Sequence, residues 1–415
     1  MSNQDISRKI NQLKDTARFG RHQFMNLGKN AIIKIFGKGR NAVSFIAVRG
    51  VKEFDEITEY LYNSEQTIVD DYSLITFQEE LCRLLKRLNQ ENRKAILADW
   101  KGFIKELKDR PDISVKSLAS IYGVTMNERT VTLGDFTIYK PSEINQLITN
   151  EYPRISKSKK SQLNFGGSYV IGITVKAKDF QKCYELADKA FSSFENVANF
   201  ITAGFHKTNR IGIFNYSFSK KVVSISLTQD KVSKSTKTLE QFGIIPIDNP
   251  LYQDVENGNK EMWQWITIRR NDLQQKILDS IEWAGKALVE SDDSKALLQY
   301  IISIEALLQY DEGKFIVPSI VSQLSDMVAF LLGESHKQRV SYSNYIKDLY
   351  KIRSSITHSG KSNINDISLH TAHVLTHKII RKIITHPPYK TFVTKKSLCK
   401  YLIELKFGIP ENDSL

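Results

Sequence analysis

Cysteine is scarce in this chain, and the three that occur (Cys82, Cys183 and Cys399) are far apart in the sequence. An odd number at such spacing fits neither a disulfide framework nor a cysteine-rich metal cluster. The sequence also lacks an apolar run long enough to span a bilayer, and the stretch around 43–48 is far too short. The first residues, Met-Ser-Asn-Gln-Asp, have no charged-then-apolar leader pattern. These absences predict a protein of the reducing cytoplasm that does not enter a membrane.

A phosphate-binding glycine loop is absent as well, because no Gly-x4-Gly-Lys-Ser/Thr pattern occurs. Bound ATP is therefore not indicated, and we expect no cofactor. The sequence Gly166-Gly-Ser168 is similar to the Gly-Ser start of nucleotidyltransferases, but the paired aspartates that such an enzyme needs do not follow it. We interpret it as a turn before a strand that begins at Tyr169.

Positive charge, in contrast, is abundant. The chain has 59 Lys and Arg against 46 Asp and Glu, a formal net charge of +13. Residues 1–50 carry +8 of this, and such a field attracts polyanions over about 8–10 Å at physiological salt. Nucleic acid is the partner we expect, and an anionic membrane surface is the weaker alternative. The cations of this segment are Arg8, Lys9, Lys14, Arg18, Arg21, Lys29, Lys34, Lys38, Arg40 and Arg49.

A second basic segment, Arg154-Ile-Ser-Lys-Ser-Lys-Lys-Ser161, is rich in serine and is predicted to be an exposed loop. Cations on a loop can contact nucleic-acid phosphates without reading a base sequence. The candidate RNA-binding residues are Arg154, Lys157, Lys159, Lys160 and, further along the chain, Lys351.

The length of 415 residues predicts two or three domains, and 41% hydrophobic with 25% charged residues is typical of globular proteins. Apolar spacing predicts helices over 73–107 and 180–201, and strands over 131–139, 169–175, 221–227 and 262–268, with a loose stretch at 231–237. The predicted fold class is α+β and multidomain, with a mixed α/β region before a C-terminal antiparallel helical bundle. Its predicted parts are a basic N-terminal helical region with a short hairpin (1–140), a small α/β domain (141–268), a helical domain (269–388) and a C-terminal extension (389–415).

The C-terminal bundle is predicted from local signals alone. After Asn271, which is a good helix cap, apolar residues recur at helical spacing almost to the Pro387-Pro388 pair. Short connections between amphipathic helices are typical of an antiparallel bundle. The predicted helices cover 272–290, 293–309, 317–332, 343–357 and 366–384.

The fourth of these helices carries the candidate chemistry. Tyr345, Leu349, Ile352 and Ile356 form one apolar stripe. At about 100° per residue, Arg353 and His358 lie about 140° apart, with their midpoint away from that stripe. We therefore expect both side chains to face out of the bundle core.

Arginine and histidine together suit phosphodiester chemistry. Arginine is a permanent planar cation that can stabilise charge on a phosphate. Histidine changes protonation near neutral pH, as an acid-base catalyst must. The simpler interpretation is a surface arginine and a histidine that favours the helix C-terminal dipole. Residue spacing alone favours this simpler interpretation, because an Arg and a His five residues apart are common by chance.

A row of histidines and a pair of tryptophans are two further candidate sites. His370, His373 and His377 share one side of the last predicted helix, and the last two have a spacing that a zinc site could use. Because no Cys, Asp or Glu stands near in sequence, we expect no metal and interpret the row as a polar or RNA-facing edge. Trp263 and Trp265 have strand spacing and are interpreted as packing residues.

The sequence from Leu349 to Gly360, Leu-Tyr-Lys-Ile-Arg-Ser-Ser-Ile-Thr-His-Ser-Gly, resembles the Arg-x4-His signature of HEPN domains, and most of all the Apea-like branch. A Tyr three residues before the arginine and a Gly after the histidine recur there, and Tyr350 and Gly360 take those places. The preceding helix, Tyr300–Leu308, is also similar, with a single acid, Glu305, among apolar residues. The resemblance covers roughly 270–385. Many active members have Asn, Asp or His after the arginine, where this chain has Ser354.

The resemblance implies a specific activity. HEPN ribonucleases usually dimerise, cleave RNA through the ribose 2′-hydroxyl to leave a 2′,3′-cyclic phosphate, and use no metal. Many are toxins or antiviral effectors. It implies that His358 is the general acid or base, that Arg353 binds the phosphate, and that Glu305, Tyr350 and Ser354 support them. The equal alternative for Glu305 is a buried carboxylate in a purely structural pair.

Two functions therefore follow from the sequence. The first is a metal-independent endoribonuclease, a homodimer whose basic N-terminal and central parts bind RNA or sense a viral or cellular trigger. The second is a non-catalytic module that binds RNA or protein, with Arg353 and His358 serving structure only. A membrane-surface protein using the basic N-terminal segment is a third and weaker interpretation.

Overall fold

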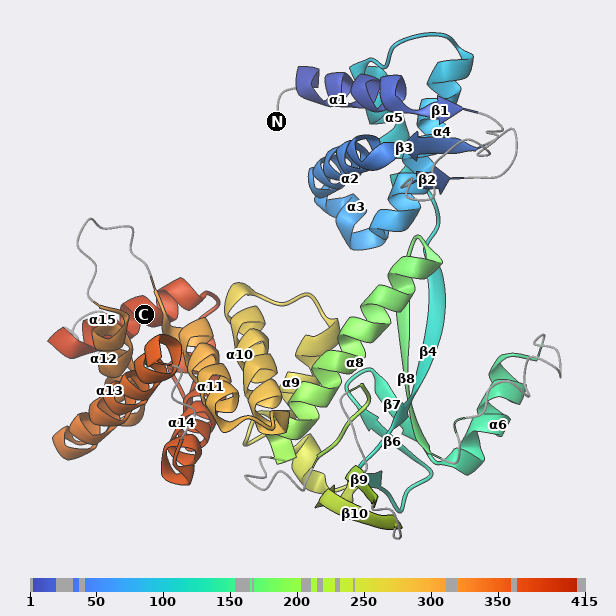
Figure 1. Cartoon of the computed structure of the whole chain (residues 1–415). Helices are drawn as coiled ribbons and strands as arrows, with labels where there is room; N and C mark the ends of the chain where they lie inside the picture. The colour runs from blue at the N-terminus through green and yellow to red at the C-terminus, as the bar shows by residue number, and fades with distance from the viewer. Residues whose placement is uncertain are drawn as a thin grey trace. The chain divides into compact units, whose positions relative to one another are not determined.

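The computed structural model describes residues 3–19, 33–36, 42–153, 165, 168–202, 210–214, 219–227, 232–241, 243–310, 319–359 and 364–408. The fold is α+β, with small sheets and a helical C-terminal region, which confirms the predicted fold class at that level (Figure 1). The chain divides into two compact units, one formed by 1–117 with 174–188 and the other by 118–173 with 189–415. The finer four-part division stays a prediction. In the described part of the chain, no helix is long and apolar enough to cross a membrane.

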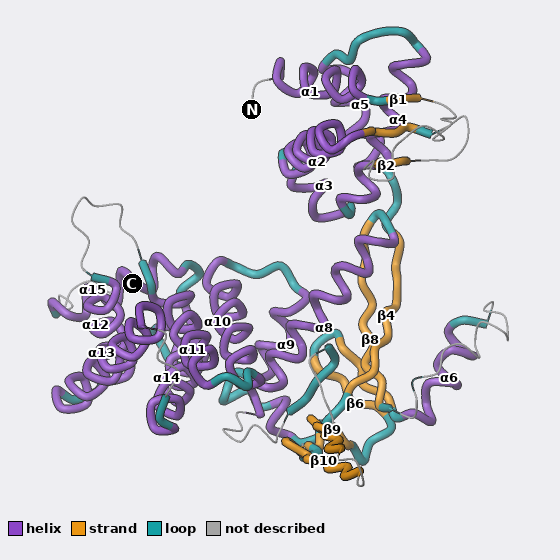
Figure 2. Tube along the Cα trace, viewed as in Figure 1, coloured by secondary structure: helices purple, strands orange, loops and turns teal. Residues whose placement is uncertain are grey.

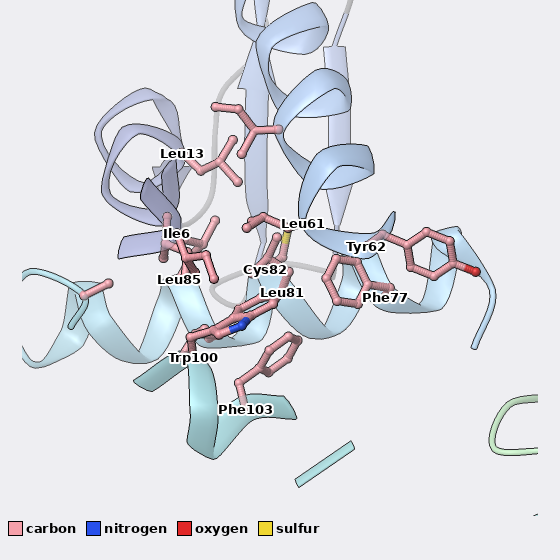
Figure 3. Close-up of a cluster of buried hydrophobic side chains, with 14 of the residues drawn as sticks. Ile6, Leu13, Leu61, Tyr62, Phe77, Leu81, Cys82, Leu85, Trp100 and Phe103 are labelled. Carbon is pink, nitrogen blue, oxygen red and sulfur yellow. The ribbon is translucent and has the colours of Figure 1, made fainter. Parts of the chain in front are cut away.

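The first unit is built mainly from helices around one apolar core. Phe77 on α4 lies at its centre, with ring centroids 5.4 Å from Tyr62, 6.4 Å from Trp100 and 5.8 Å from Phe103 (Figure 3). The helical stretch predicted over 73–107 is confirmed, although it is broken at 91–96. The helices are α1 (Asn3–Thr16), α2 (Ala47–Asn63), α3 (Gln66–Asp71), α4 (Leu74–Gln90) and α5 (Leu97–Lys108).

A three-stranded antiparallel sheet also belongs to this unit, and the sequence did not predict it. Its order is β1 (Arg18–Phe19), β3 (Val43–Ile46), β2 (Ile33–Phe36), with Ile35 paired to Ser44. Phe45 on β3 packs on Phe54 of α2 at 4.2 Å between ring centroids, which joins the sheet to the helical core.

A four-stranded sheet follows along the chain, in the order β4 (Ile113–Ile121), β8 (Tyr169–Ala177), β7 (Phe136–Tyr139), β6 (Thr130–Leu133) (Figure 2). The predicted hairpin about Gly134-Asp135 and the predicted strand at 169–175 are confirmed. Gly134 has φ +58°, and an added Cβ would lie 2.9 Å from the carbonyl oxygen of Trp263. The hairpin turn therefore needs glycine twice over, for its backbone angle and for its close packing.

The remaining elements of the middle region are short. The predicted helix over 180–201 and the strand over 221–227 are confirmed as α8 and β9, whereas the stretch 231–237, predicted to be loose, lies mostly in strand β10. These elements are α6 (Pro141–Glu151), α8 (Phe180–Thr202), the antiparallel pair β9 (Ser219–Leu227) and β10 (Val232–Gln241), the parallel pair β5 (Val124–Thr125) and β11 (Ile245–Pro246), and the 3-10 helix η3 (Pro250–Gln253).

The strand predicted at 262–268 is wrong, because this segment forms helix α9 (Asn259–Thr267). Helical spacing places Met262, Trp263 and Ile266 on one buried face. The Trp263 ring stacks on Phe194 at 4.9 Å, and its indole N–H donates to the Tyr252 carbonyl at 2.7 Å. Trp263 is therefore a packing residue, as predicted, but on a helix.

The five C-terminal helices predicted from the sequence are confirmed, and the fourth begins seven residues earlier than expected. Side chains cap their first turns: Asn271 accepts from the Gln274 N–H, and Asp292 accepts from the N–H groups of Ser294 and Lys295. The helices are α10 (Asp272–Val289), α11 (Asp293–Leu308), α12 (Ile320–Leu332), α13 (His336–Ser359) and α14 (Asp366–Thr385). The 3-10 helix η4 (Tyr389–Thr391) and helix α15 (Lys395–Phe407) follow.

Candidate functional site

Helices α11 and α13 meet at a small polar cluster that contains three of the predicted site residues. The Tyr350 hydroxyl donates to Glu305 Oε1 at 2.6 Å, and Arg353 Nη2 lies 3.5 Å from the same oxygen. The Arg353 guanidinium also lies over the Tyr350 ring, 5.5 Å from its centroid. We call these residues, Glu305, Tyr350 and Arg353, the Glu305 cluster.

Burial explains why the three side chains pair. The Glu305 side chain is 13% exposed, and a carboxylate this far from water needs donors to offset its lost hydration. Burial first, and then the hydrogen bond to Glu305, raise the pKa of the Tyr350 phenol above its ordinary value of 10.0. The phenol therefore stays protonated and remains a donor. The Arg353 side chain is 39% exposed, so its guanidinium is held at one edge and open to solvent at the other.

Helix α15 fixes the end of the helix that carries Glu305. The last four carbonyls of a helix have no partner within it. Lys395 Nζ donates to the carbonyls of Glu305 (3.3 Å) and Ala306 (2.8 Å). The thiol of Cys399 contacts the next two, those of Leu307 (3.8 Å) and Leu308 (3.7 Å). The position of Glu305 thus depends on a segment about 90 residues further along the chain.

His358 stands apart from this cluster. It lies in the last turn of α13 and is exposed to solvent. Among the described residues, no ion pair or hydrogen bond joins it to Arg353, which pairs with Glu305 instead. Five residues along a helix turn the side-chain direction by about 140° and advance it by about 7.5 Å. Within one chain, the arginine and the histidine are therefore neighbours along the helix but do not share a face.

The expectation that both side chains face out of the core is wrong for Arg353. The buried face of α13 is formed by Ile346, Leu349 and Tyr350, while Tyr345, which the predicted stripe included, is 46% exposed. The buried face of α13 therefore lies nearer to Arg353 than the predicted apolar stripe does, and the Arg353 side chain points to α11. His358 alone faces outward, as expected.

The other predicted residues on α13 are exposed. Lys351 forms an ion pair with Asp348 at 3.0 Å, and Ser354 is exposed one turn before His358. Both residues, together with Tyr350, line a groove of about 760 Å³ between α12 and α13. The sequence analysis missed this groove, because it depends on how two helices pack.

The histidine row of α14 is mostly buried. The ring of His377 stacks on Phe200 at 4.1 Å between centroids, and His373 lies 4.4 Å from it and bonds the Tyr300 hydroxyl at 3.0 Å. Burial, and then the neighbouring His373, lower the pKa of His377 well below its ordinary value of 6.5. The RNA-facing edge predicted here is wrong for His373, which is buried inside the unit, whereas His377 is partly buried against Phe200 and His370 is exposed. In the described part of the chain, no group of three or more His, Cys, Asp or Glu could hold a metal ion.

The N-terminal cations are partly engaged inside their own unit. Arg8 pairs with Asp5 at 2.7 Å, Lys34 pairs with Asp55, and Lys14 donates to the Arg93 carbonyl at 2.7 Å. Of these three contacts, only that of Lys34 with Asp55 lowers the net charge of the segment, because Asp5 is already included in the +8 and a carbonyl leaves the charge of Lys14 in place. The predicted RNA contacts Arg154, Lys157, Lys159 and Lys160 lie outside the described residues.

Comparison with known proteins gives no further guide, because no family model, curated protein or solved structure matches this chain.

Proposed function

We propose that the helical C-terminal region is a metal-independent endoribonuclease of the HEPN type that acts as a toxin-like or antiviral effector. The observation that supports it best is the Glu305 cluster, which orients Arg353 on the same helix that exposes His358. A half-exposed guanidinium and an exposed imidazole are the two groups that phosphodiester cleavage by acid-base catalysis needs.

In this mechanism, a neutral His358 takes the proton of a ribose 2′-hydroxyl as its oxygen attacks phosphorus. The bond from phosphorus to the 5′-oxygen breaks, and a protonated histidine gives its proton to that leaving oxygen. The products are a 2′,3′-cyclic phosphate and a 5′-hydroxyl. Arg353 stabilises the charge that gathers on the phosphate oxygens, and Glu305 and Tyr350 hold the guanidinium in place.

A homodimer would bring together Arg353 and His358, which lie on different sides of α13 within one chain. Because Arg353 and His358 lie about 140° apart around α13, one copy presents them to different sides of the helix. Two copies facing each other across the ends of α13 would supply two histidines, one as base and one as acid, and two arginines. The dimer and the RNA partner are parts of the proposal.

The test is induced expression of wild type, His358→Ala and His336→Ala, followed by growth measurement and by mapping of cyclic-phosphate ends in total RNA. His336 is a matched control, because it is an exposed histidine in the first turn of the same helix. Loss of a general acid-base catalyst costs about 10²–10⁴-fold in rate. We expect wild type and His336→Ala to fragment RNA and His358→Ala to leave it intact.

RNA fragmentation by His358→Ala at the wild-type level would overturn the catalytic role. If purified wild-type protein binds RNA but leaves its phosphodiester bonds intact, the non-catalytic binding module replaces the nuclease.

A further inference from the structure

The groove between α12 and α13 is lined, on α13, by side chains on the same face of the helix as His358. Lys347, Lys351 and Ser354 on α13 all line it. At about 100° per residue, these side chains and His358 fall within about 60° of each other around the helix axis. We call Lys347, Lys351, Ser354 and His358 the α13 row. It extends about 16 Å along the axis, at about 1.5 Å per residue, and ends at the proposed catalytic histidine.

The charges in the groove favour an anionic ligand. Its two carboxylates already have cationic partners, since Asp348 pairs with Lys351 at 3.0 Å and Asp326 pairs with Lys406 at 2.7 Å. Lys347 is exposed and has no ion pair with a carboxylate in the described part of the chain. The groove therefore keeps one uncompensated cation, Lys347, about three helical turns before His358.

The rest of the lining combines small polar side chains with Val321 and Tyr350. Asn344 on α13 is exposed, and Ser319, Ser322 and Ser325 line the groove from α12. An amide can both donate to and accept from a nucleobase edge, and hydroxyls can bond ribose or phosphate oxygens. These polar groups suit the ribose, phosphate and base edges of a polynucleotide strand.

We propose that this groove binds the single-stranded RNA that leads to the cleaved bond, with Lys347 on a phosphate and Asn344 on a base or ribose. The inference rests on the proposed function, because His358 defines the end of the row. A single strand fits better than a duplex, since basic grooves follow one backbone and leave its bases free for contact.

The test measures binding of a short RNA whose 2′-hydroxyls are all methylated, so that it has no nucleophile and cannot be cut. Its dissociation constant is measured by fluorescence anisotropy over a series of salt concentrations. The proteins are wild type, the double variant Lys347→Ala with Lys351→Ala, and the control Lys337→Ala. Lys337 is exposed on the same helix but does not line the groove.

Each phosphate contact contributes about 0.7 to the slope of log affinity against log salt for a single strand. We expect the double variant to bind more weakly near physiological salt, with a slope smaller by about 0.7, the contribution of Lys347, because Lys351 is already paired with Asp348. The control variant keeps the wild-type affinity and slope. An unmethylated RNA of the same sequence, cut in parallel by each protein, should show the groove effect in KM and leave kcat unchanged.

The outcomes separate the two proposals. If wild type cuts RNA but the double variant binds and cuts like wild type, the groove assignment is overturned and the nuclease stands. If wild type binds the methylated RNA through the groove but cuts nothing, the nuclease fails and the groove stands. Absence of binding by wild type overturns the groove assignment, and equal affinity for a methylated duplex overturns the choice of a single strand.

Discussion

The hydrogen bond between Tyr350 and Glu305 gives a sharp test of the site, independent of any RNA. The perturbation is a double-mutant cycle with Tyr350→Phe, Glu305→Met and the two combined. Phenylalanine removes only the hydroxyl, and methionine removes the carboxylate while keeping much of the side-chain volume. The cycle cancels changes in packing that either substitution makes alone, so the coupling energy reports the bond itself.

The magnitude follows from burial and distance. The bond is 2.6 Å long, Tyr350 is 8% exposed and the acceptor is a carboxylate, so the coupling should be about 1.5–3 kcal/mol. The neighbouring ion pair of Arg353 with Glu305 is longer, at 3.5 Å, and its arginine is 39% exposed. A cycle with Arg353→Met should therefore give only about 0.2–1 kcal/mol.

The assay is native-state hydrogen exchange of the amides of α11 and α13, which reports local free energies of unfolding without requiring the whole chain to unfold at once. The single variants should each lower protection in both helices. A Tyr350 coupling below about 0.5 kcal/mol, or an Arg353 coupling larger than it, would refute the view that the buried phenol is the main partner of Glu305.

The remaining predictions concern stability, measured by urea unfolding. Burial keeps His377 neutral in the folded state, whereas the unfolded chain takes up a proton near pH 6.5. The free energy of unfolding should therefore stay constant above that pH and fall below it, by up to about 1.4 kcal/mol per pH unit. His377→Phe should remove this component of the pH dependence. Gly134→Ala should cost about 1–3 kcal/mol, because it combines a positive φ with a clash on Trp263, and a neutral result would contradict that packing. Gly102→Ala, in α5 with nothing within 4 Å of the added Cβ, should stabilise by up to about 1 kcal/mol. Asp179→Ala should lower the free energy of unfolding by about 2 kcal/mol, since the Asp179 carboxylate accepts from the buried Ser73 N–H at 2.7 Å. A much smaller loss would argue against this hydrogen bond.

The C-terminal helices could be predicted because their signals are local. Asn271, the cap predicted from the sequence, stands just before apolar residues at helical spacing and caps α10 in the structure. The segment 262–268 was predicted wrongly because seven residues with apolar side chains at most positions fit either period. Only its packing against Phe194 selects the helix.

Three of the predicted residues, Glu305, Tyr350 and Arg353, lie together in the structure, but their geometry could not be predicted. The sequence around Arg353 resembles a known motif, and that resemblance implied roles for Glu305 and Tyr350. The structure joins these two residues by a hydrogen bond. The direction of Arg353 was missed, because the apolar spacing within α13 is compatible with two neighbouring faces and only contact with α11 decides between them. The ion pair of Lys34 with Asp55 was missed for the same reason, since its partners lie 21 residues apart.

The attachment of α15 to the end of α11 has a consequence for synthesis on the ribosome. Glu305 leaves the exit tunnel long before Lys395 and Cys399, which contact the last carbonyls of its helix. At about 5–20 residues per second, the 90 residues between Glu305 and Lys395 correspond to a delay of about 5–20 s. During that interval the nascent chain carries Glu305 on a helix whose last carbonyls still lack their contacts from α15. The Glu305 cluster would therefore reach its final support only after Lys395 and Cys399 have emerged.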